Sequence, residues 1–281
     1  MITEDQRARR QEGKQVNPSP QPSPTRGEGV NSRVDFSLPL ITGLPRSLRS
    51  LAMTKPAFTL AEVLITLGII GIVAAMTLPA LIQNHRNQVA ETRLKKFYSA
   101  INQAIIASEA VNGDRTEWHS SSVYDVPESG RNEQAKVWFD TYLKPYIKVI
   151  DEGYSSDNRF IVYFSDGSAL KFLNDDCLRD FLFYIGNPEK CDNKISNPYG
   201  RCKFAFLYAP GYSDHSYWSY SGRNFEPYKY LWNGNITSLY TGEGVYTSTA
   251  CNSSGDGRYC SAIIQYNNWK IPKDYPRKIL Y

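Results

Sequence analysis

Residues 58–83 read FTLAEVLITLGIIGIVAAMTLPALIQ, and this stretch decides the architecture of the chain. It contains no charged side chain between Val63 and Leu81, and Glu62 is the single acid in the run that starts at Phe58. An α-helix of about 20 apolar residues crosses the hydrocarbon core of a bilayer. A cleaved secretory signal has a shorter apolar region of about 7–15 residues, and a buried core helix is seldom apolar on every side. We therefore predict a membrane-spanning helix over residues 58–81.

The residues before this run form a separate segment. Residues 1–52 are rich in Pro, Ser and Arg and have neither helical nor strand periodicity, so they cannot bury enough apolar surface to fold. They are either a disordered cytoplasmic tail or untranslated sequence upstream of a true start at Met53. The short basic leader Met53–Ala57 favours the start at Met53. Basic residues flank the apolar run on both sides, so composition leaves its orientation open.

Charge and cysteine spacing exclude several classes of function. The net charge of +4 arises in residues 1–57, which hold nine basic and five acidic residues and leave 23 of each in the rest of the chain. A neutral body lacks the basic face that nucleic-acid binding requires, so no nucleic-acid partner is expected. None of the five cysteines forms a CxxC pair, which argues against zinc ribbons and thioredoxin-like sites.

The sequence contains no pattern that predicts an enzyme. HExxH, GxSxG, Walker and GxGxxG motifs are absent, and His85, His119 and His215 are isolated. The paired acids at 151–152 and 175–176 fit solvated loops. Asp256 lies between two glycines without the alternating acids of a calcium loop, which favours a plain turn. We expect no catalytic residue, no cofactor and no metal site.

Glu62 is the unusual residue of the apolar run. An acid at the centre of a bilayer costs about 2.5–3.5 kcal/mol on insertion scales, and less near an end. Glu62 either reaches the headgroups from its place one turn after the leader, or pairs with a positive group of another chain.

The leader and the apolar run together resemble a known family. Lys55-Pro56-Ala57, followed by Phe58-Thr59-Leu60-Ala61-Glu62-Val63-Leu64-Ile65 and ending in Gly71-Ile72-Val73-Ala74-Ala75-Met76-Thr77-Leu78-Pro79, resembles the N-terminus of type IV pilins and type II secretion pseudopilins. In that family a prepilin peptidase cuts the leader before a Phe, which is then N-methylated, and the fifth mature residue is Glu.

The resemblance assigns roles to five residues. Phe58 would be the new N-terminus, and Glu62 the acid that neutralises the α-amino group of a neighbouring subunit. Gly71 and Pro79 fall where the family commonly has a helix-loosening Gly and a kinking Pro. The family usually has Gly before the cut, and this chain has Ala57, a small residue with which cleavage stays plausible.

The resemblance also implies a function and a location. The chain would be a structural subunit of a type IV pilus or a type II secretion pseudopilus, placed once through the bacterial inner membrane with its head in the periplasm. Its partners would be the prepilin peptidase and N-methylase, other pilin or pseudopilin subunits and the inner-membrane assembly platform. The alternative is a membrane-anchored periplasmic binding module that never polymerises and needs neither cleavage at Ala57 nor Glu62.

After Pro79 the pattern becomes amphipathic and then changes to strands. Apolar positions at three- and four-residue steps predict an amphipathic helix over residues 82–113, stopped by Asn112-Gly113-Asp114. Its apolar stripe consists of Leu94, Phe97, Ile101, Ile105 and Ser108. Residues 114–281 form the expected extracytoplasmic head, so the fold is α+β: a long N-terminal helix packed on an antiparallel sheet of about four or more strands, as the family resemblance also implies.

Several segments of the head carry specific predictions. Strands are expected at 159–164 and 168–173, joined by an Asp166-Gly167 hairpin, and also at 203–208 and 261–266. A short helix within 135–150 should break at Pro145. The aromatic residues of 212–246 favour ordinary packing over an adhesive surface.

All five cysteines lie in the head, where an extracytoplasmic setting permits disulfides. Cys251 and Cys260 enclose a short Gly- and Ser-rich loop, so a local bridge between them is the preferred pairing. The other three, Cys177, Cys191 and Cys202, leave three pairings open. A disulfide near the C-terminus also recurs in pilins, and residues 260–276 look like the ending of a subgroup of prepilin-like proteins.

Overall fold

The computed structural model describes residues 58–118, 131–173, 180–210 and 224–281. Contacts divide the chain into two units, Met1–Ala57 and Phe58–Tyr281, and every described residue belongs to the second. The predictions for residues 1–57, including the start at Met53 and the cut after Ala57, concern residues outside the described ranges, as do those for Cys177, His119 and His215.

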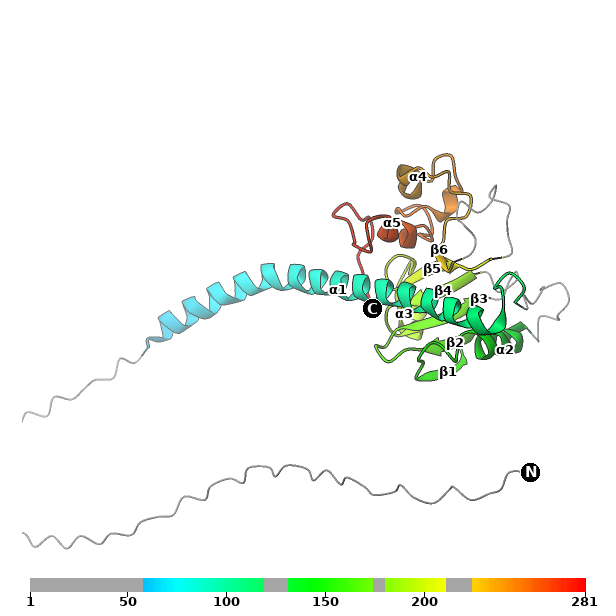
Figure 1. Ribbon diagram of the computed structural model, residues 1–281. Coiled ribbons are helices and arrows are strands. Elements are labelled where there is room, and N and C mark those ends of the chain that lie inside the picture. The colour runs from blue at the N-terminus through cyan, green and yellow to red at the C-terminus, as the bar shows by residue number, and fades with distance from the viewer. Residues whose placement is uncertain (1–57, 119–130, 174–179, 211–223) are drawn as a thin grey trace, which may run out of the picture. The chain divides into compact units, whose positions relative to one another are not determined.

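A single helix, α1 (Leu60–Asn112), runs for 53 residues without a break (Figure 1). Its first part contains the apolar run, and its second part carries a buried stripe. All five predicted stripe residues are buried, together with Ala90 and Ala104. Gly113 ends the helix at the predicted position with a φ of 80°, and its N–H donates to the Glu109 carbonyl. The apolar and amphipathic segments are therefore one continuous rod.

The head is built on a six-stranded sheet whose order follows the sequence, with every neighbouring pair antiparallel. Its strands are β1 (Asp151–Tyr154), β2 (Phe160–Tyr163), β3 (Ala169–Leu173), β4 (Asp180–Tyr184), β5 (Lys203–Leu207) and β6 (Glu226–Pro227). The Asp166-Gly167 turn joins β2 and β3 as predicted, with Gly167 at a φ of 79°. The α+β class and the antiparallel sheet are thus confirmed.

The helices cover the two faces of the sheet. α1 and α2 (Arg131–Tyr142) lie on one face. The other face is covered by α3 (Pro188–Lys194), α4 (Ile236–Thr241) and α5 (Cys260–Tyr266), with the 3₁₀ turn η3 (Thr247–Thr249) between the last two. Alternate residues of each strand point to opposite faces, so neighbours such as Phe183 and Tyr184 serve different cores. The sheet is therefore the middle of three layers.

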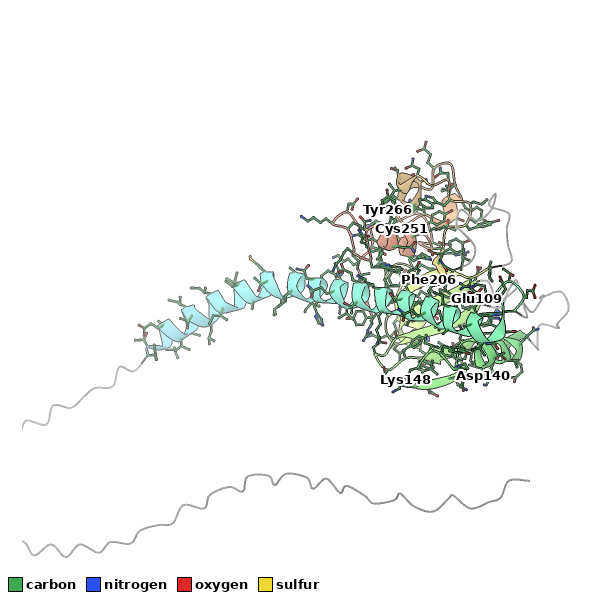
Figure 2. The ribbon with its side chains drawn as sticks, in the orientation of Figure 1. Glu109, Asp140, Lys148, Phe206, Cys251 and Tyr266 are labelled. Atoms are coloured by element: carbon green, nitrogen blue, oxygen red, sulfur yellow. A yellow bond between two sulfur atoms is a disulfide. The ribbon has the colours of Figure 1, made fainter. Side chains whose placement is uncertain are left out.

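The first core is an aromatic cluster that holds α1 to the sheet. Phe97 of α1 stacks on Phe183 of β4, with ring centroids 4.2 Å apart, and meets Phe206 of β5 edge-on at 5.3 Å. Figure 2 labels Phe206 beside the second part of α1. Aromatic pairs add about 0.5–1.5 kcal/mol beyond the burial of their area. This cluster fixes the second part of α1 to the head.

Two predicted elements of the head need correction, and Asp151 and Glu152, which were expected in a solvated loop, begin strand β1 instead. The strand expected at residues 261–266 is wrong, because residues Cys260–Tyr266 form helix α5. A short apolar run fits a buried strand and a buried helix equally well, and the N–H groups of Ala262 and Ile263 bond locally to the Tyr259 carbonyl. The helix expected within 135–150 begins earlier, at Arg131, and ends at Tyr142, before Pro145 is reached.

Candidate functional site

The first turn of α1 is closed by a capping box. Thr59 is the N-cap, and its hydroxyl oxygen accepts a hydrogen bond from the Glu62 backbone N–H at 3.2 Å. The Glu62 carboxylate accepts in return from the Thr59 backbone N–H at 2.8 Å and from the Thr59 hydroxyl at 2.9 Å. This reciprocal arrangement satisfies N–H groups that a helix start leaves without partners. Glu62 therefore has a local role that the sequence analysis missed, although Thr59-x-x-Glu62 before an apolar run is the sequence pattern of a capping box.

The apolar side chains after Glu62 are exposed on all sides of the helix. Leu64, Ile72 and Met76 are 61%, 60% and 75% exposed, and the most apolar part of α1 buries nothing in the chain. Figure 2 shows side chains projecting around this whole part of the helix. α1 is the one described helix that is long and apolar enough to cross a membrane. We call residues Leu60–Ile82 the exposed half of α1, and residues Gln83–Asn112 the docked half.

The two threonine hydroxyls of the exposed half find their acceptors within the helix itself. The hydroxyl of Thr66 donates to the Val63 carbonyl at 3.0 Å, and that of Thr77 donates to the Val73 carbonyl at 3.0 Å. Such back-bonding leaves no side-chain hydroxyl in need of water. These two hydroxyls therefore add little polar cost when the helix lies in an apolar surrounding.

Gly71 and Pro79 both lie in the exposed half. A methyl group built on Gly71 would meet no atom within 4 Å, so nothing in the described chain demands a glycine there. Pro79 lies inside the helix, where its ring removes one backbone hydrogen bond. The helix continues through it.

The second predicted site, the disulfide between Cys251 and Cys260, is present in the head. A second bridge joins Cys191 to Cys202, one of the three pairings left open. Both bridges belong to the core on the far side of the sheet from α1. The structure therefore does not bring the cysteines together with Glu62, Gly71 or Pro79.

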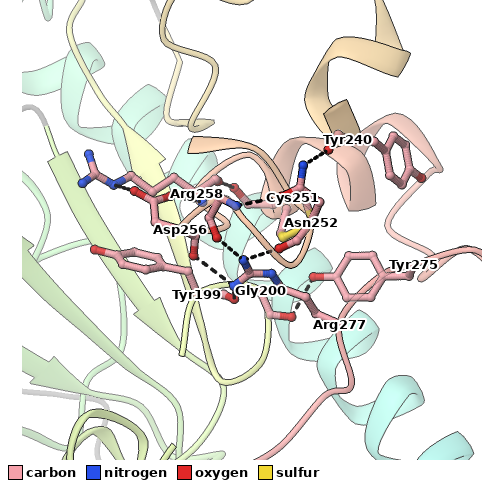
Figure 3. Close-up of a disulfide and its surroundings, with 12 residues drawn as sticks. Tyr199, Gly200, Tyr240, Cys251, Asn252, Asp256, Arg258, Tyr275 and Arg277 are labelled. Carbon is pink, nitrogen blue, oxygen red and sulfur yellow. Dashed lines mark hydrogen bonds and ion pairs between the residues drawn. A yellow bond between two sulfur atoms is a disulfide. The ribbon is translucent and has the colours of Figure 1, made fainter. Parts of the chain in front are cut away.

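Arg277 organises the loop that the Cys251–Cys260 bridge closes (Figure 3). Its side chain is 5% exposed, and its two terminal nitrogens donate to five backbone carbonyl oxygens. The acceptors, at 2.6–3.5 Å, are Asn197, Tyr199, Asn252, Gly255 and Asp256. Burial lowers the pKa of the guanidinium, but arginine stays protonated in proteins. Sequence reasoning missed this residue, because no spacing rule marks an arginine that binds carbonyls.

Two positions of this loop require glycine because a larger side chain would clash. A methyl group on Gly257, where φ is 95°, would lie 2.5 Å from Nη1 of Arg277, and one on Gly255 would lie 2.3 Å from the Ala250 carbonyl oxygen. The carboxylate of Asp256 pairs with Arg258 at 3.0 Å and accepts from the Arg258 backbone N–H. The described residues contain no group of three or more His, Cys, Asp or Glu side chains placed to hold a metal ion.

One family is similar to this chain over most of its length. The sequence model described as "Family of unknown function (DUF6613)" matches residues 80–279. The chain belongs to this family. The match begins directly after Pro79, so it covers the docked half of α1 and the head but only the last three residues of the exposed half. Searches of curated proteins and of solved structures found no match to the chain.

Proposed function

We propose that this protein is a prepilin-like structural subunit of a type IV pilus or type II secretion pseudopilus, cut before Phe58 and assembled through the exposed half of α1. The observation that carries the proposal is the division of α1. One continuous helix is built into the head at one end and exposes apolar side chains on all sides at the other. The N-terminal resemblance to pilins supports the same function.

The exposed half needs a cover that the described chain does not supply. Burying one large aliphatic side chain is worth about 1.5–3 kcal/mol, and this half exposes such side chains along its whole length. Exposed apolar surfaces of this size mark contacts with lipid or with other proteins. A bilayer covers the half before assembly, and neighbouring copies of the same half cover it in a filament.

The negative charge of Glu62 sets the axial register between neighbouring subunits by pairing with a positive group. Cleavage before Phe58 creates an α-amino group, a cation next to the capping box. An ionised carboxylate has about four acceptor sites, and Thr59 occupies only one oxygen of Glu62 in the described chain. The carboxylate can therefore keep its capping role and also accept a hydrogen bond from the α-amino group of a neighbour.

Two covalent steps precede assembly in this proposal. The prepilin peptidase removes the leader, and its N-methylase activity modifies Phe58. The inner-membrane platform then adds subunits at the base of the filament, so the work of the chain is mechanical and the chain itself catalyses nothing. The head projects into the periplasm.

The first test is mass spectrometry of the N-terminal peptide from membranes that contain the peptidase. We expect a mature chain that begins at N-methylated Phe58. A chain that keeps residues 53–57 would instead favour the anchored binding module that does not polymerise.

A matched pair of variants tests assembly separately. Glu62→Ala should insert in the membrane at the wild-type level and be absent from sheared or cross-linked filaments. Glu62→Gln keeps acceptor and shape but removes the charge, so it separates the capping role from the pairing role. Incorporation of both variants at the wild-type level would contradict the proposed role of Glu62.

A further inference from the structure

A polar groove of about 740 Å³ lies where the docked half of α1 meets the tail that follows α5. Its helix side carries the amide side chains of Gln83, Asn84, Asn87 and Gln88, and its other side is built from residues between Lys270 and Lys278. The size is typical of a small-ligand site. We call this the junction groove.

The two walls of the junction groove are fixed to one another. Glu91 of α1 accepts from Nζ of Lys270 at 2.7 Å and from the Ile271 backbone N–H at 2.9 Å. Nε2 of Gln83 donates to the Ile279 carbonyl at 3.4 Å. The groove is therefore held at both ends by contacts between residues distant in sequence.

The charge inside the junction groove is positive. Lys273 and Lys278 line it, are exposed, and have no ion pair within the described ranges. Glu91 is the one acid among the lining residues, and its carboxylate already pairs with Lys270 of the tail. Arg277 directs its guanidinium into the carbonyl cage of the disulfide loop, and Asp274 is exposed but does not line the groove. The ammonium groups of Lys273 and Lys278 and the amides of Asn84, Asn87 and Gln88 therefore line the groove, whereas the Gln83 NH2 group already donates to Asn87 Oδ1 and the Ile279 carbonyl.

This chemistry fits a phosphate diester. Lysine binds phosphate as a compact point charge, and amide side chains donate to phosphate or glycerol oxygens. A neutral polar ligand would leave the ammonium groups of Lys273 and Lys278 without a counter-charge from the ligand.

The position of the groove identifies the source of the phosphate. A helix that enters the hydrocarbon core at Leu60 leaves it about 20 residues later, near Pro79. The headgroup layer adds about 5–7 Å on each side, or roughly four residues of helix. Gln83 and Asn84 then lie at the level of the lipid phosphates. The junction groove opens where headgroups are present at high local concentration.

We propose that the junction groove binds the phosphate headgroup of an anionic phospholipid. This inference rests on the membrane-spanning part of the proposed function, and neither cleavage nor assembly is needed for it. A bound lipid sets the depth and rotation of α1 and holds the head against the membrane surface until the subunit leaves the bilayer.

Native mass spectrometry of the full chain, extracted from bacterial membranes in mild detergent, tests the proposal. Phosphatidylglycerol and phosphatidylcholine are the added probes. We expect the wild-type chain to retain phosphatidylglycerol and to lose phosphatidylcholine. The double variant K273E/K278E should retain at least about tenfold less phosphatidylglycerol, since each basic residue near an anionic surface contributes substantially to binding.

Three controls make the result specific. K273R/K278R keeps both charges and should retain the lipid, whereas K273A/K278A adds no acid and should lose most of it. K95E/K194E changes the net charge as much as K273E/K278E does, at exposed positions outside the groove, and should retain the lipid. Equal retention by K273E/K278E and the wild type would overturn the proposal, as would equal loss from K95E/K194E.

Two readouts separate this proposal from its alternatives. Displacement of the lipid by inorganic phosphate at millimolar concentration would show a general phosphate site and overturn the assignment to lipid. A second copy of the chain in place of lipid would appear as a dimer in the same spectra and overturn it too. The chain mass in these spectra reports cleavage before Phe58, so a failure of processing is seen independently of the groove.

Discussion

The two halves of α1 have the same backbone and opposite surroundings. In the docked half, Leu94 and Ile101 are fully buried, whereas Leu64 and Ile72 in the exposed half are about 60% exposed. Both halves are one continuous α-helix, so the backbone conformation does not distinguish them. Packing does, because most helix stability in proteins comes from burial of an apolar face. The docked half is stabilised by its own chain, and the exposed half depends on what surrounds it.

The same truncation in each half should give the largest contrast. Ile101→Ala removes a buried side chain from the first core and should lower the free energy of unfolding of the head by about 2–5 kcal/mol. Ile72→Ala should change it by less than about 0.5 kcal/mol. Denaturant titration of the full chain in detergent, followed by tryptophan fluorescence, measures both. Equal losses would mean that the two halves unfold as one unit.

A pair of glycine substitutions should give effects of opposite sign. Gly113 ends the docked half with φ 80° and ψ −175°, a region that is essentially restricted to glycine, so Gly113→Ala should destabilise the head by about 1–3 kcal/mol. Gly71→Ala meets open space and should raise helix stability by about 0.5–1 kcal/mol. Circular dichroism during thermal unfolding in detergent follows both variants. A loss of stability on Gly71→Ala would contradict this contrast.

Glu91→Ala should loosen the docked half at its boundary with the exposed half. It removes the acceptor of Lys270 and of the Ile271 N–H, so we expect a loss of about 1–2 kcal/mol, since hydrogen bonds to charged groups are worth about 1.5–3 kcal/mol and Lys270 is largely exposed. Hydrogen exchange should quicken in residues 270–278. Unchanged protection of Ile271 would contradict this role, and Glu62→Ala serves as the control in the other half.

The smallest expected effect is on the pH dependence of docking. Burial alone would raise the pKa of Asp166, but hydrogen bonds from the side chain and backbone of Ser168 and the pairing with Lys96 of α1 lower it. A lowered folded-state pKa contributes stability that is present above the ordinary value of about 3.9 and lost as the pH falls through the folded value. Asp166→Asn should remove this acid dependence, at a cost below about 1 kcal/mol at pH 7 because Lys96 is exposed. Acid titration of unfolding compares the variant with the wild type.

The parts of the fold that sequence predicted are those with local rules. The stop at Gly113, the Asp166-Gly167 hairpin and the buried stripe of α1 all follow from positive φ or from periodicity. β4 was not predicted, although its apolar run is buried on both faces in the same way as the predicted strands β3 and β5. α5 was mistaken for a strand for a related reason: Cys260–Ile264 is buried throughout, and only tertiary contacts choose between helix and strand.

The residues of the candidate site also differ in how far the sequence predicts them. The positions of Glu62, Gly71 and Pro79 along an exposed apolar helix follow from sequence, whereas their roles in assembly stay predictions. The Cys251–Cys260 pairing could be predicted from sequence because the loop between the two cysteines is short. The role of Arg277 and the junction groove could not be predicted from sequence, since both depend on contacts between residues far apart in the chain.

The tail that closes the junction groove also sets an order in time. Lys270 contacts Glu91 across 179 positions of sequence, and Ile279 contacts Gln83 across 196. During synthesis, the helix leaves the ribosome long before the residues that hold it. The described strands and the Cys191–Cys202 and Cys251–Cys260 bridges are synthesised after the helix and before Ile279. The docked half of α1 is therefore synthesised before the residues that bury it, and the surface where the two halves of α1 meet is completed last.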